Sequence, residues 1–268
     1  MAILIATRGQ KSGECNICGE KAKLTEDHTP PKGCINIGQV ELHHITEHLA
    51  FERTKSKGRH SQNGVKYRTL CGRCNNSLLG IQYDPTFINF VNGIGNLLRS
   101  GLQLPPIMPI RVAPQKLMRS LLGHLSAQGI ERYKKEPMAE YIRDYFLDEN
   151  KPLPSEIKIY FWPYPFKRHV MARDCTYSDI RVEGSFRMWF LKFFPVAFLV
   201  TFNEPASYSF PYVSLSSWGK EKIDFEVDIP INLRSITPGY WPEAPTENSF
   251  LVYGQEAIVS FNWKKIAS

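Results

Sequence analysis

The sequences CNIC at residues 15–18 and CGRCNN at residues 71–76 decide how the N-terminal part of this chain folds. Each contains two cysteines separated by two residues, and four thiolates arranged in such pairs can bind one tetrahedral zinc ion. The spacer between the pairs is much longer than the roughly 15–20 residues of a compact zinc ribbon. We therefore expect a structural zinc ion that clips together the two ends of an inserted module, with Cys15, Cys18, Cys71 and Cys74 as its ligands.

Buried free thiols or disulfides are the alternative interpretation of these cysteines. The first residues, MAILIA, form too short an apolar run and lack the basic start of a secretory signal peptide. This predicts a cytoplasmic location, where reducing conditions disfavour disulfides. The remaining Cys34 and Cys175 are expected to be small buried thiols, with Cys34 as a substitute ligand if one of the four fails.

The sequence TEDHTPPKG at residues 25–33 lies between the cysteine pairs and carries groups suited to hydrolysis. The imidazole of His28 titrates near neutral pH and can take a proton from water. The Asp27 carboxylate and an asparagine amide oxygen after the second cysteine pair are hard ligands suited to Mg²⁺ or Mn²⁺. Adjacent residues on a strand point to opposite sides, so Asp27 and His28 share a site only if the chain bends, as Pro30-Pro31 and Gly33 predict. The alternative for Asp27 and His28 is a solvated surface turn.

The order CNIC, EDHTPPKG and LCGRCNN resembles an HNH nuclease of the ββα-metal type with a zinc frame, over about residues 13–95. The resemblance implies that Asp27 binds a divalent Mg or Mn ion and that His28 is the general base. It also implies that Asn75 completes the metal site, with Asn76 as its close competitor. The family's middle asparagine has only a loose match, Asn63, which lies farther from the second cysteine pair than usual.

The charge of the chain is consistent with an acidic polymer as partner. The formal net charge is +7, and most of it lies in residues 1–80. Basic side chains can neutralise phosphates without reading the base sequence. We expect nucleic-acid contacts, to DNA rather than RNA, from Arg53, Lys55, Lys57, Arg59, Lys66 and Arg68. An ordinary solvated loop explains the run at residues 53–59 equally well.

Hydrophobic periodicity divides the rest of the chain into a helical and a β-rich part. Helices are expected over residues 39–53, 75–100 with a fresh start at Asp84-Pro85, 115–133 and 140–147. Strands are expected over residues 20–33, 64–71, 157–162, 186–190, 193–202 and 223–229. Residues 104–109, rich in proline, are expected to be a stiff linker.

The predicted fold class is α+β: an N-terminal zinc-stabilised ββα-metal module, a helical segment and a β-rich C-terminal domain. The domains are residues 1–104 and residues 105–268, the second with a regulatory, recognition or partner-docking role. No apolar stretch is long enough for a membrane span.

The predicted function is that of a metal-dependent endonuclease that hydrolyses phosphodiester bonds in DNA. By analogy it would be an effector of prokaryotic antiviral defence or of a mobile element. The alternative is a non-catalytic zinc module that binds nucleic acid or a partner protein, with Asp27 and His28 only structural. Cleavage of RNA instead of DNA is a third possibility that the sequence leaves open.

Overall fold

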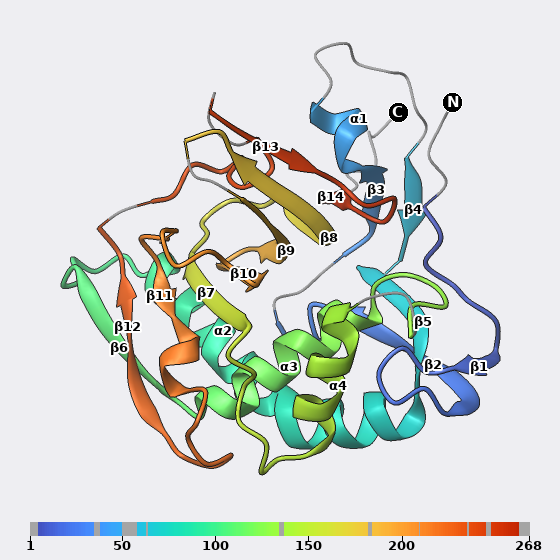
Figure 1. Ribbon diagram of the computed structural model, residues 1–268. Helices are drawn as coiled ribbons and strands as arrows, with labels where there is room; N and C mark the ends of the chain where they lie inside the picture. The colour runs from blue at the N-terminus through green and yellow to red at the C-terminus, as the bar shows by residue number, and fades with distance from the viewer. Residues whose placement is uncertain are drawn as a thin grey trace.

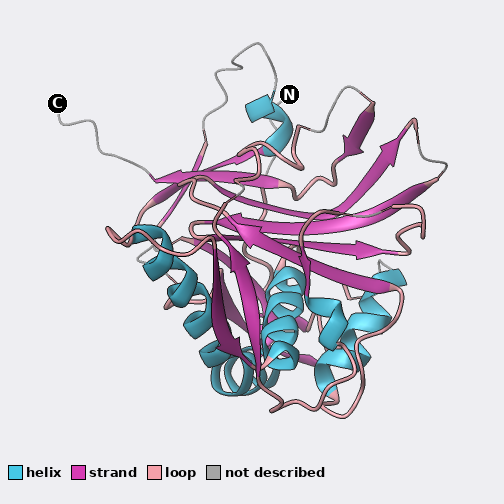
Figure 2. Cartoon of the chain, turned by 90° about the vertical axis from the view of Figure 1, so that its left-hand side faces the viewer, coloured by secondary structure: helices cyan, strands magenta, loops and turns pink. Residues whose placement is uncertain are grey.

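The computed structural model describes residues 5–34, 38–49, 58–62, 64–133, 137–181, 184–208, 210–234, 236–244 and 248–262. It is a mixed α/β structure, rich in strands and with few helices (Figure 1). A nine-stranded sheet forms one layer, and the longer helices gather on one side of it (Figure 2). The predicted α+β class is confirmed at this level.

The large sheet is antiparallel and joins strands from distant parts of the chain. Its order is β11 (Val213–Ser214), β7 (Ile157–Pro163), β10 (Val196–Phe202), β9 (Ser185–Phe193), β8 (His169–Asp179), β14 (Ile258–Asn262), β3 (Val40–His44) and β4 (Arg59–Ser61). β13 (Ser249–Val252) also pairs with β8. The turn η2 (Leu215–Trp218) directly follows β11. Strands expected from alternation or apolar runs at residues 157–162, 186–190 and 193–202 are therefore present.

The apolar sequence of strand β10 is explained by burial on both faces of the sheet. Its alternate residues Phe198 and Val200 pack into the cluster on the helix side of the sheet. The intervening Ala197 and Leu199 pack into a second cluster on the opposite face, with the aromatic side chains of Trp162 and Phe210 among its members. A strand buried on both faces has no polar side to alternate with.

The helices α2 (Asp84–Arg99), α3 (Pro114–Ala127) and α4 (Pro137–Leu147) cover one face of the sheet (Figure 2). α2 begins at Asp84, where a fresh helix was expected. α3 ends at Ala127, earlier than expected, because Gly129 and Glu131 take positive φ values of 88° and 56°. These values end a right-handed helix.

The C-terminal end of α3 is tied to the N-terminal part of the chain. Its last carbonyl groups have no partner within the helix. Asn16 Nδ2 donates to the Ser126 carbonyl oxygen at 3.1 Å, and Thr69 Oγ1 donates to that of Ala127 at 2.6 Å. The buried Arg173 guanidinium donates to the Ser126 oxygen at 2.9 Å and places a positive charge at the negative end of the helix dipole.

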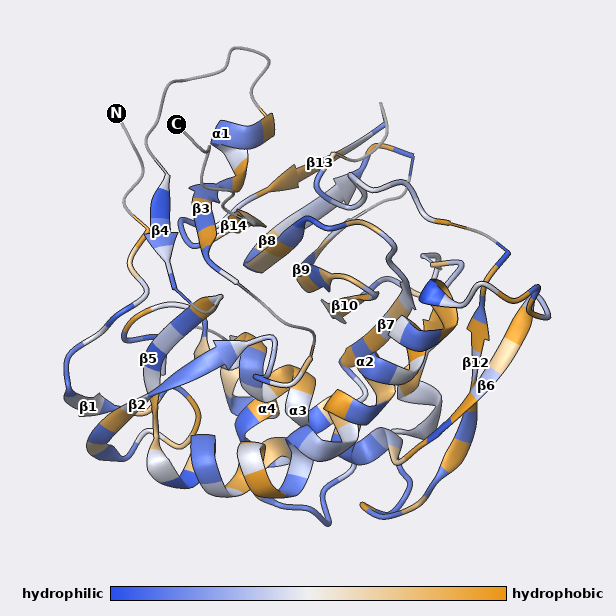
Figure 3. Ribbon diagram, turned by 180° about the vertical axis from the view of Figure 1, so that it is seen from behind, coloured by the Kyte–Doolittle hydropathy of each residue, from blue (hydrophilic) through white to orange (hydrophobic). Residues whose placement is uncertain are grey.

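The N-terminal sheet contains β1 (Ser12–Glu14), β2 (Lys21–Thr29) and β5 (Val65–Cys71), in that order. β5 leads into η1 (Arg73–Tyr83), a π-helix that continues as α2. The strands expected at residues 20–33 and 64–71 are confirmed in shorter form. β2 is coloured mainly as hydrophilic in Figure 3, because few of its residues face the core.

Three expectations for local structure are wrong. Residues 40–44 form β3, which pairs with β14, and only Ile45–Leu49 form the helix α1; Ala50 to Arg53 lie outside the described residues. The expected linker instead contains the start of β6 (Ile107–Val112), which pairs with β12 (Val227–Asn232). The strand expected at residues 223–229 begins only at Val227. In the first two cases pairing with a distant segment outweighs the local pattern, and in the third the pairing with β6 starts only at Val227.

One hydrophobic cluster spans both sides of residue 104. It includes Cys15 and Cys74 from the N-terminal part, Leu121 of α3 and Phe198 of the large sheet. Among the residues that the structure describes, no helix has the length and apolar character needed to cross a membrane.

Gly123 allows α3 to pack closely against η1 and α4. A Cβ atom at this position would lie 2.6 Å from side-chain atoms of both Leu79 and Phe146. We expect Gly123→Ala to lower the free energy of unfolding by about 1–3 kcal/mol, since overpacking exceeds the gain of about 1 kcal/mol in helix propensity.

Gly80→Ala is the matched control, because Gly80 is exposed in η1 and its nearest neighbour would lie at 3.4 Å. We expect it to raise the free energy of unfolding by about 0.4–1 kcal/mol. Denaturant unfolding of both variants checks the pair. Equal stability of the two variants would show that the α3 contact is not close.

Candidate metal centre and adjoining polar site

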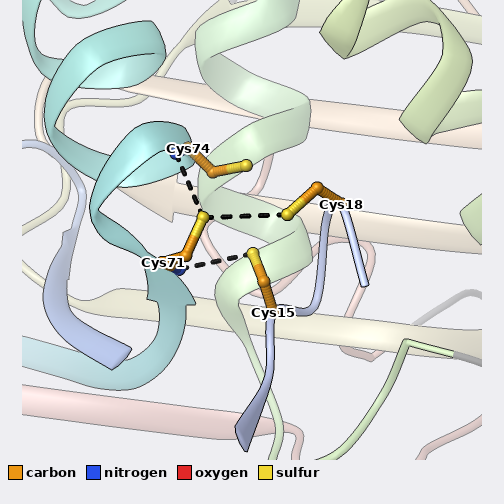
Figure 4. A group of neighbouring side chains, drawn as sticks. All are labelled: Cys15, Cys18, Cys71 and Cys74. Carbon is orange, nitrogen blue, oxygen red and sulfur yellow. Dashed lines mark hydrogen bonds between the residues drawn. The ribbon is translucent and has the colours of Figure 1, made fainter. Parts of the chain in front are cut away.

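Four cysteine side chains converge at the junction between β5 and η1. Cys15 and Cys18 lie in the loop after β1, Cys71 ends β5, and Cys74 lies in the first turn of η1, with all four sulfur atoms turned toward one another (Figure 4). The sulfur atoms all lie within 4.8 Å of one another, and Cys18 Sγ is 3.7 Å from Cys71 Sγ. A tetrahedral zinc site with Zn–S bonds of about 2.3 Å has S–S separations of about 3.8 Å. The cluster can therefore hold a structural metal such as zinc.

Backbone groups orient these sulfur atoms. The amide of Cys71 donates to Cys15 Sγ at 3.3 Å, and that of Cys74 donates to Cys71 Sγ at 3.5 Å. The turn after Cys15 is closed by the Gly19 amide, which donates to the Cys15 carbonyl at 2.9 Å. Gly19 has a φ of 74°, which favours glycine, so the sequence CNICG builds the loop that presents the first pair.

The electrostatics of the four thiols favour a cation at their centre. A hydrogen bond with Cys74 lowers the pKa of Cys15 to about 5. Burial raises the pKa of Cys18 to about 12, and the bond to Cys15 raises the pKa of Cys74. Without a cation, only part of the cluster ionises readily, because neighbouring thiolates repel one another. A coordinating divalent metal deprotonates such thiols outright.

Asn75 fastens the first turn of η1 to strand β2. Its Nδ2 atom donates to Thr25 Oγ1 at 2.8 Å and to the Glu26 carbonyl oxygen at 3.1 Å. Because a carbonyl oxygen only accepts, the amide nitrogen must be the atom that faces it. The structure therefore places Asn75 against the segment of β2 that directly precedes Asp27, while Asn76 is exposed on the same turn.

Asp27 points into the protein, toward α3. It is 2% exposed, and its Oδ2 accepts hydrogen bonds from His124 Nδ1 at 2.9 Å and Thr29 Oγ1 at 3.3 Å. The other ring nitrogen of His124, Nε2, lies 2.9 Å from Asp84 Oδ1, which also accepts from Ser120 Oγ at 2.8 Å. Three elements thus contribute one residue each to a buried trio: Asp27 from β2, Asp84 from the start of α2 and His124 from α3.

His124 is the polar site residue that the sequence interpretation did not identify. The available signal was its position: it lies three residues after Leu121 and seven after Leu117, on the apolar face expected for that helix. A histidine on such a face requires a partner when buried. The sequence alone does not identify that partner, because Asp27 lies on a distant strand.

The neighbouring carboxylates favour the protonated form of His124. Burial alone would lower the pKa of His124, but the Asp27 and Asp84 carboxylates outweigh it and raise this pKa to about 10. Burial raises the pKa of Asp27, and His124 acts against that effect. Burial alone would raise the pKa of Asp84, but the neighbouring His124 outweighs this effect and lowers the pKa. At neutral pH the imidazolium therefore donates from both ring nitrogens.

His28 lies on the opposite side of β2 from Asp27. It is partly exposed and opposes Lys66 in the register of β2 and β5. The strand remains extended through Thr29, so the predicted bend, which would have turned Asp27 and His28 toward one site, is absent, and the two prolines follow both residues. Burial lowers the pKa of His28, and the nearby Asp27 acts against this shift. The imidazole is accordingly neutral at pH 7.

A polar cleft of about 710 Å³ adjoins this side of the N-terminal sheet. Its lining includes Arg8, Arg59, His60 and Lys66. Glu26 partly offsets this charge, with its carboxylate oxygens 3.2 Å from Arg8 Nε and 3.6 Å from Lys66 Nζ.

The other residues predicted for the site form hydrogen bonds elsewhere, lie apart from the cysteine cluster or lie outside the described residues. Arg68 uses its guanidinium to donate to the Gly9 carbonyl at 2.7 Å and is partly buried. Cys34 is fully buried and lies outside the group of four sulfur atoms. The expected contacts Arg53, Lys55 and Lys57, and the loosely matching Asn63, lie outside the described residues.

Comparisons of the chain with protein-family models, curated proteins and solved structures found no match.

We expect the protein to contain about one zinc ion per chain, measurable by atomic emission. Cys71→Ser removes one of the four ligands and should lower the free energy of unfolding by more than about 4 kcal/mol, since metal binding and folding are coupled.

Cys175→Ala is the control, because Cys175 is equally buried but lies outside the cluster. It should keep its zinc content. Protein without zinc that melts at the same temperature with and without a chelator would contradict a structural metal at this site.

Proposed function

We propose that the protein is a metal-dependent endonuclease that hydrolyses phosphodiester bonds, with DNA as substrate. In this proposal His28 is the general base, and Asp27 with Asn75 holds a Mg²⁺ or Mn²⁺ ion. The observation that carries the proposal is the pair of hydrogen bonds from Asn75 Nδ2 to Thr25 and Glu26. They bring the helix that follows the second cysteine pair against the strand that carries Asp27 and His28.

The arrangement of elements supports the same proposal. Two antiparallel strands, β2 and β5, are followed by η1, and the cysteine cluster closes the unit at the strand–helix junction. This order agrees with the HNH resemblance of the sequence. Because Asn75 uses its nitrogen for both described bonds, its amide oxygen is the atom suited to a cation.

The chemistry requires a neutral base and a cation near the phosphate. The lowered pKa of His28 keeps its imidazole unprotonated at neutral pH, so it can take a proton from water. A divalent ion would offset the charge that develops on the phosphate oxygens. Lys66 of the cleft pairs with His28 in the register of the adjacent strands β5 and β2. The basic residues of the cleft would therefore neutralise phosphates that flank the one at His28.

The inward direction of Asp27 favours a second candidate function. Its hydrogen bonds to His124 and Thr29 would serve equally well in a non-catalytic zinc module that binds nucleic acid or a partner protein. In that case His28 would be a surface residue of the binding face. Cleavage separates the two functions, because both predict binding and only the first predicts turnover.

The biological role is proposed by analogy alone. An effector of prokaryotic antiviral defence or of a mobile element would combine a cutting module with a part that restrains or directs it. Residues 105–268 would supply that second part, by docking a partner or recognising the target.

His28→Ala should reduce nicking of a supercoiled plasmid by about 10²–10⁴-fold in Mg²⁺ or Mn²⁺, the usual contribution of a positioned base. EDTA should abolish nicking by the unmodified protein. His43→Ala is the control, because His43 lies on β3 and pairs with Glu41 at 3.2 Å, away from β2. Full cleavage by His28→Ala, or no cleavage by the unmodified protein under any metal condition, would favour the binding module.

Arg59→Gln and Lys66→Gln should weaken binding to all DNA sequences about equally, because contacts to phosphates carry no base information. Each lost phosphate contact should reduce the slope of log K against log salt concentration by about 0.9. Fluorescence anisotropy at several salt concentrations measures both effects. A loss confined to one class of sequences would show that the cleft reads bases instead.

A further inference from the structure

The buried Asp27–His124–Asp84 trio joins the proposed site to a helix outside the N-terminal module. Asp27 lies on β2, Asp84 begins α2, and His124 lies in the last turns of α3. His124 and Asp27 are separated by 97 positions in the sequence, and both are almost fully buried. Close contact between them therefore depends on how α3 packs against β2, a contact that the fold makes directly.

The hydrogen bonds fix the Asp27 carboxylate in one orientation. Among the described residues, both bonds to Asp27 end on Oδ2, from His124 Nδ1 and Thr29 Oγ1. The imidazole cannot rotate without losing its second bond, to Asp84 Oδ1. Asp84 is in turn held by Ser120 Oγ. Oδ2 is thus occupied by hydrogen bonds within the protein, and Oδ1 is the oxygen of Asp27 suited to a cation.

A purely structural role explains this trio poorly. Buried ionic groups carry a desolvation cost that their mutual attraction often only balances, and apolar side chains of similar size frequently stabilise a core as well. The neighbouring positions on the same face of α3, Leu117 and Leu121, are filled in that way.

We propose that His124 is a positioning residue for Asp27, held in place by Asp84, at the divalent-metal site of the proposed nuclease. The inference rests on the proposed function. It makes α3 a part of the site, so that the metal ligand on β2 depends on a residue outside the zinc-clipped segment. Hydrogen-bonded partners of this kind orient metal ligands, and their loss commonly reduces metal affinity or activity by about 10–100-fold.

The test measures Mn²⁺ binding to the full, zinc-saturated chain by electron paramagnetic resonance, beside plasmid nicking over a range of Mn²⁺ concentrations. His124→Leu removes both donors, His124→Asn keeps a donor toward Asp27, and Asp84→Asn removes the charge that holds His124. We expect His124→Leu to bind Mn²⁺ about 10–100-fold more weakly and the other two variants to be intermediate. Turnover should recover in part at saturating Mn²⁺.

Leu117→Ala is the control for general loss of stability. It removes a buried side chain of α3 about 10 Å along the helix from His124 and should cost about 2–5 kcal/mol without changing Mn²⁺ affinity. If His124→Leu does not fold, as judged by circular dichroism, His124→Asn and Asp84→Asn decide the question. Unchanged Mn²⁺ affinity in folded His124 and Asp84 variants, or an equal loss in Leu117→Ala, would overturn the proposal.

Asp27→Ala separates this inference from the proposed function. If the unmodified protein binds Mn²⁺ in a manner that depends on Asp27 and His124 but does not cut nucleic acid, the positioning role stands and the nuclease proposal fails. If Asp27→Ala binds Mn²⁺ like the unmodified protein, the positioning role fails. Cleavage by the unmodified protein would then show whether the nuclease proposal survives with other ligands.

Discussion

The convergence of four sulfur atoms at the junction of β5 and η1 is the constraint on which the N-terminal half depends. Cys15 lies beside Asn16, whose side chain bonds the end of α3, so the cluster positions a loop that also anchors a helix. Cys74 lies beside Asn75, whose side chain bonds strand β2. One small cluster therefore sets the distance between the strand that carries Asp27 and His28 and the helices behind it. Strand β2 itself adds little apolar surface to this packing, since it is largely hydrophilic (Figure 3).

Strand β2 separates two different polar environments. On its inner side, Asp27 joins a largely buried network with His124 and Asp84. On its outer side, His28 lies near Lys66 and the polar cleft. The same two adjacent positions thus combine a rigid, water-excluded carboxylate with an accessible imidazole.

The sequence predicted the local features of this protein better than the distant ones. The cysteine spacing predicted that the four sulfur atoms converge, since two Cys-x-x-Cys pairs are the ligand pattern of one tetrahedral metal site. The start of α2 at Asp84 and the run of β10 also followed from local patterns. By contrast, residues 40–44 have helical spacing but form β3, because β14 supplies hydrogen bonds that the local pattern cannot reveal. His124 was missed for the same reason, since its partner Asp27 is brought to it only by the packing of α3 on β2.

The placement of β14 between β8 and β3 has a consequence for the order in which the protein forms during synthesis. β3, at residues 40–44, is linked to the rest of the large sheet through residues 258–262, and the Ile45 amide also donates to the Ala257 carbonyl. The ribosome must therefore release residues 258–262 before β3 and β4 can join the rest of this sheet. Pairing over such a sequence distance is slow, because a long loop must close before its contacts form. A nascent chain can form its cysteine cluster well before it can complete the large sheet.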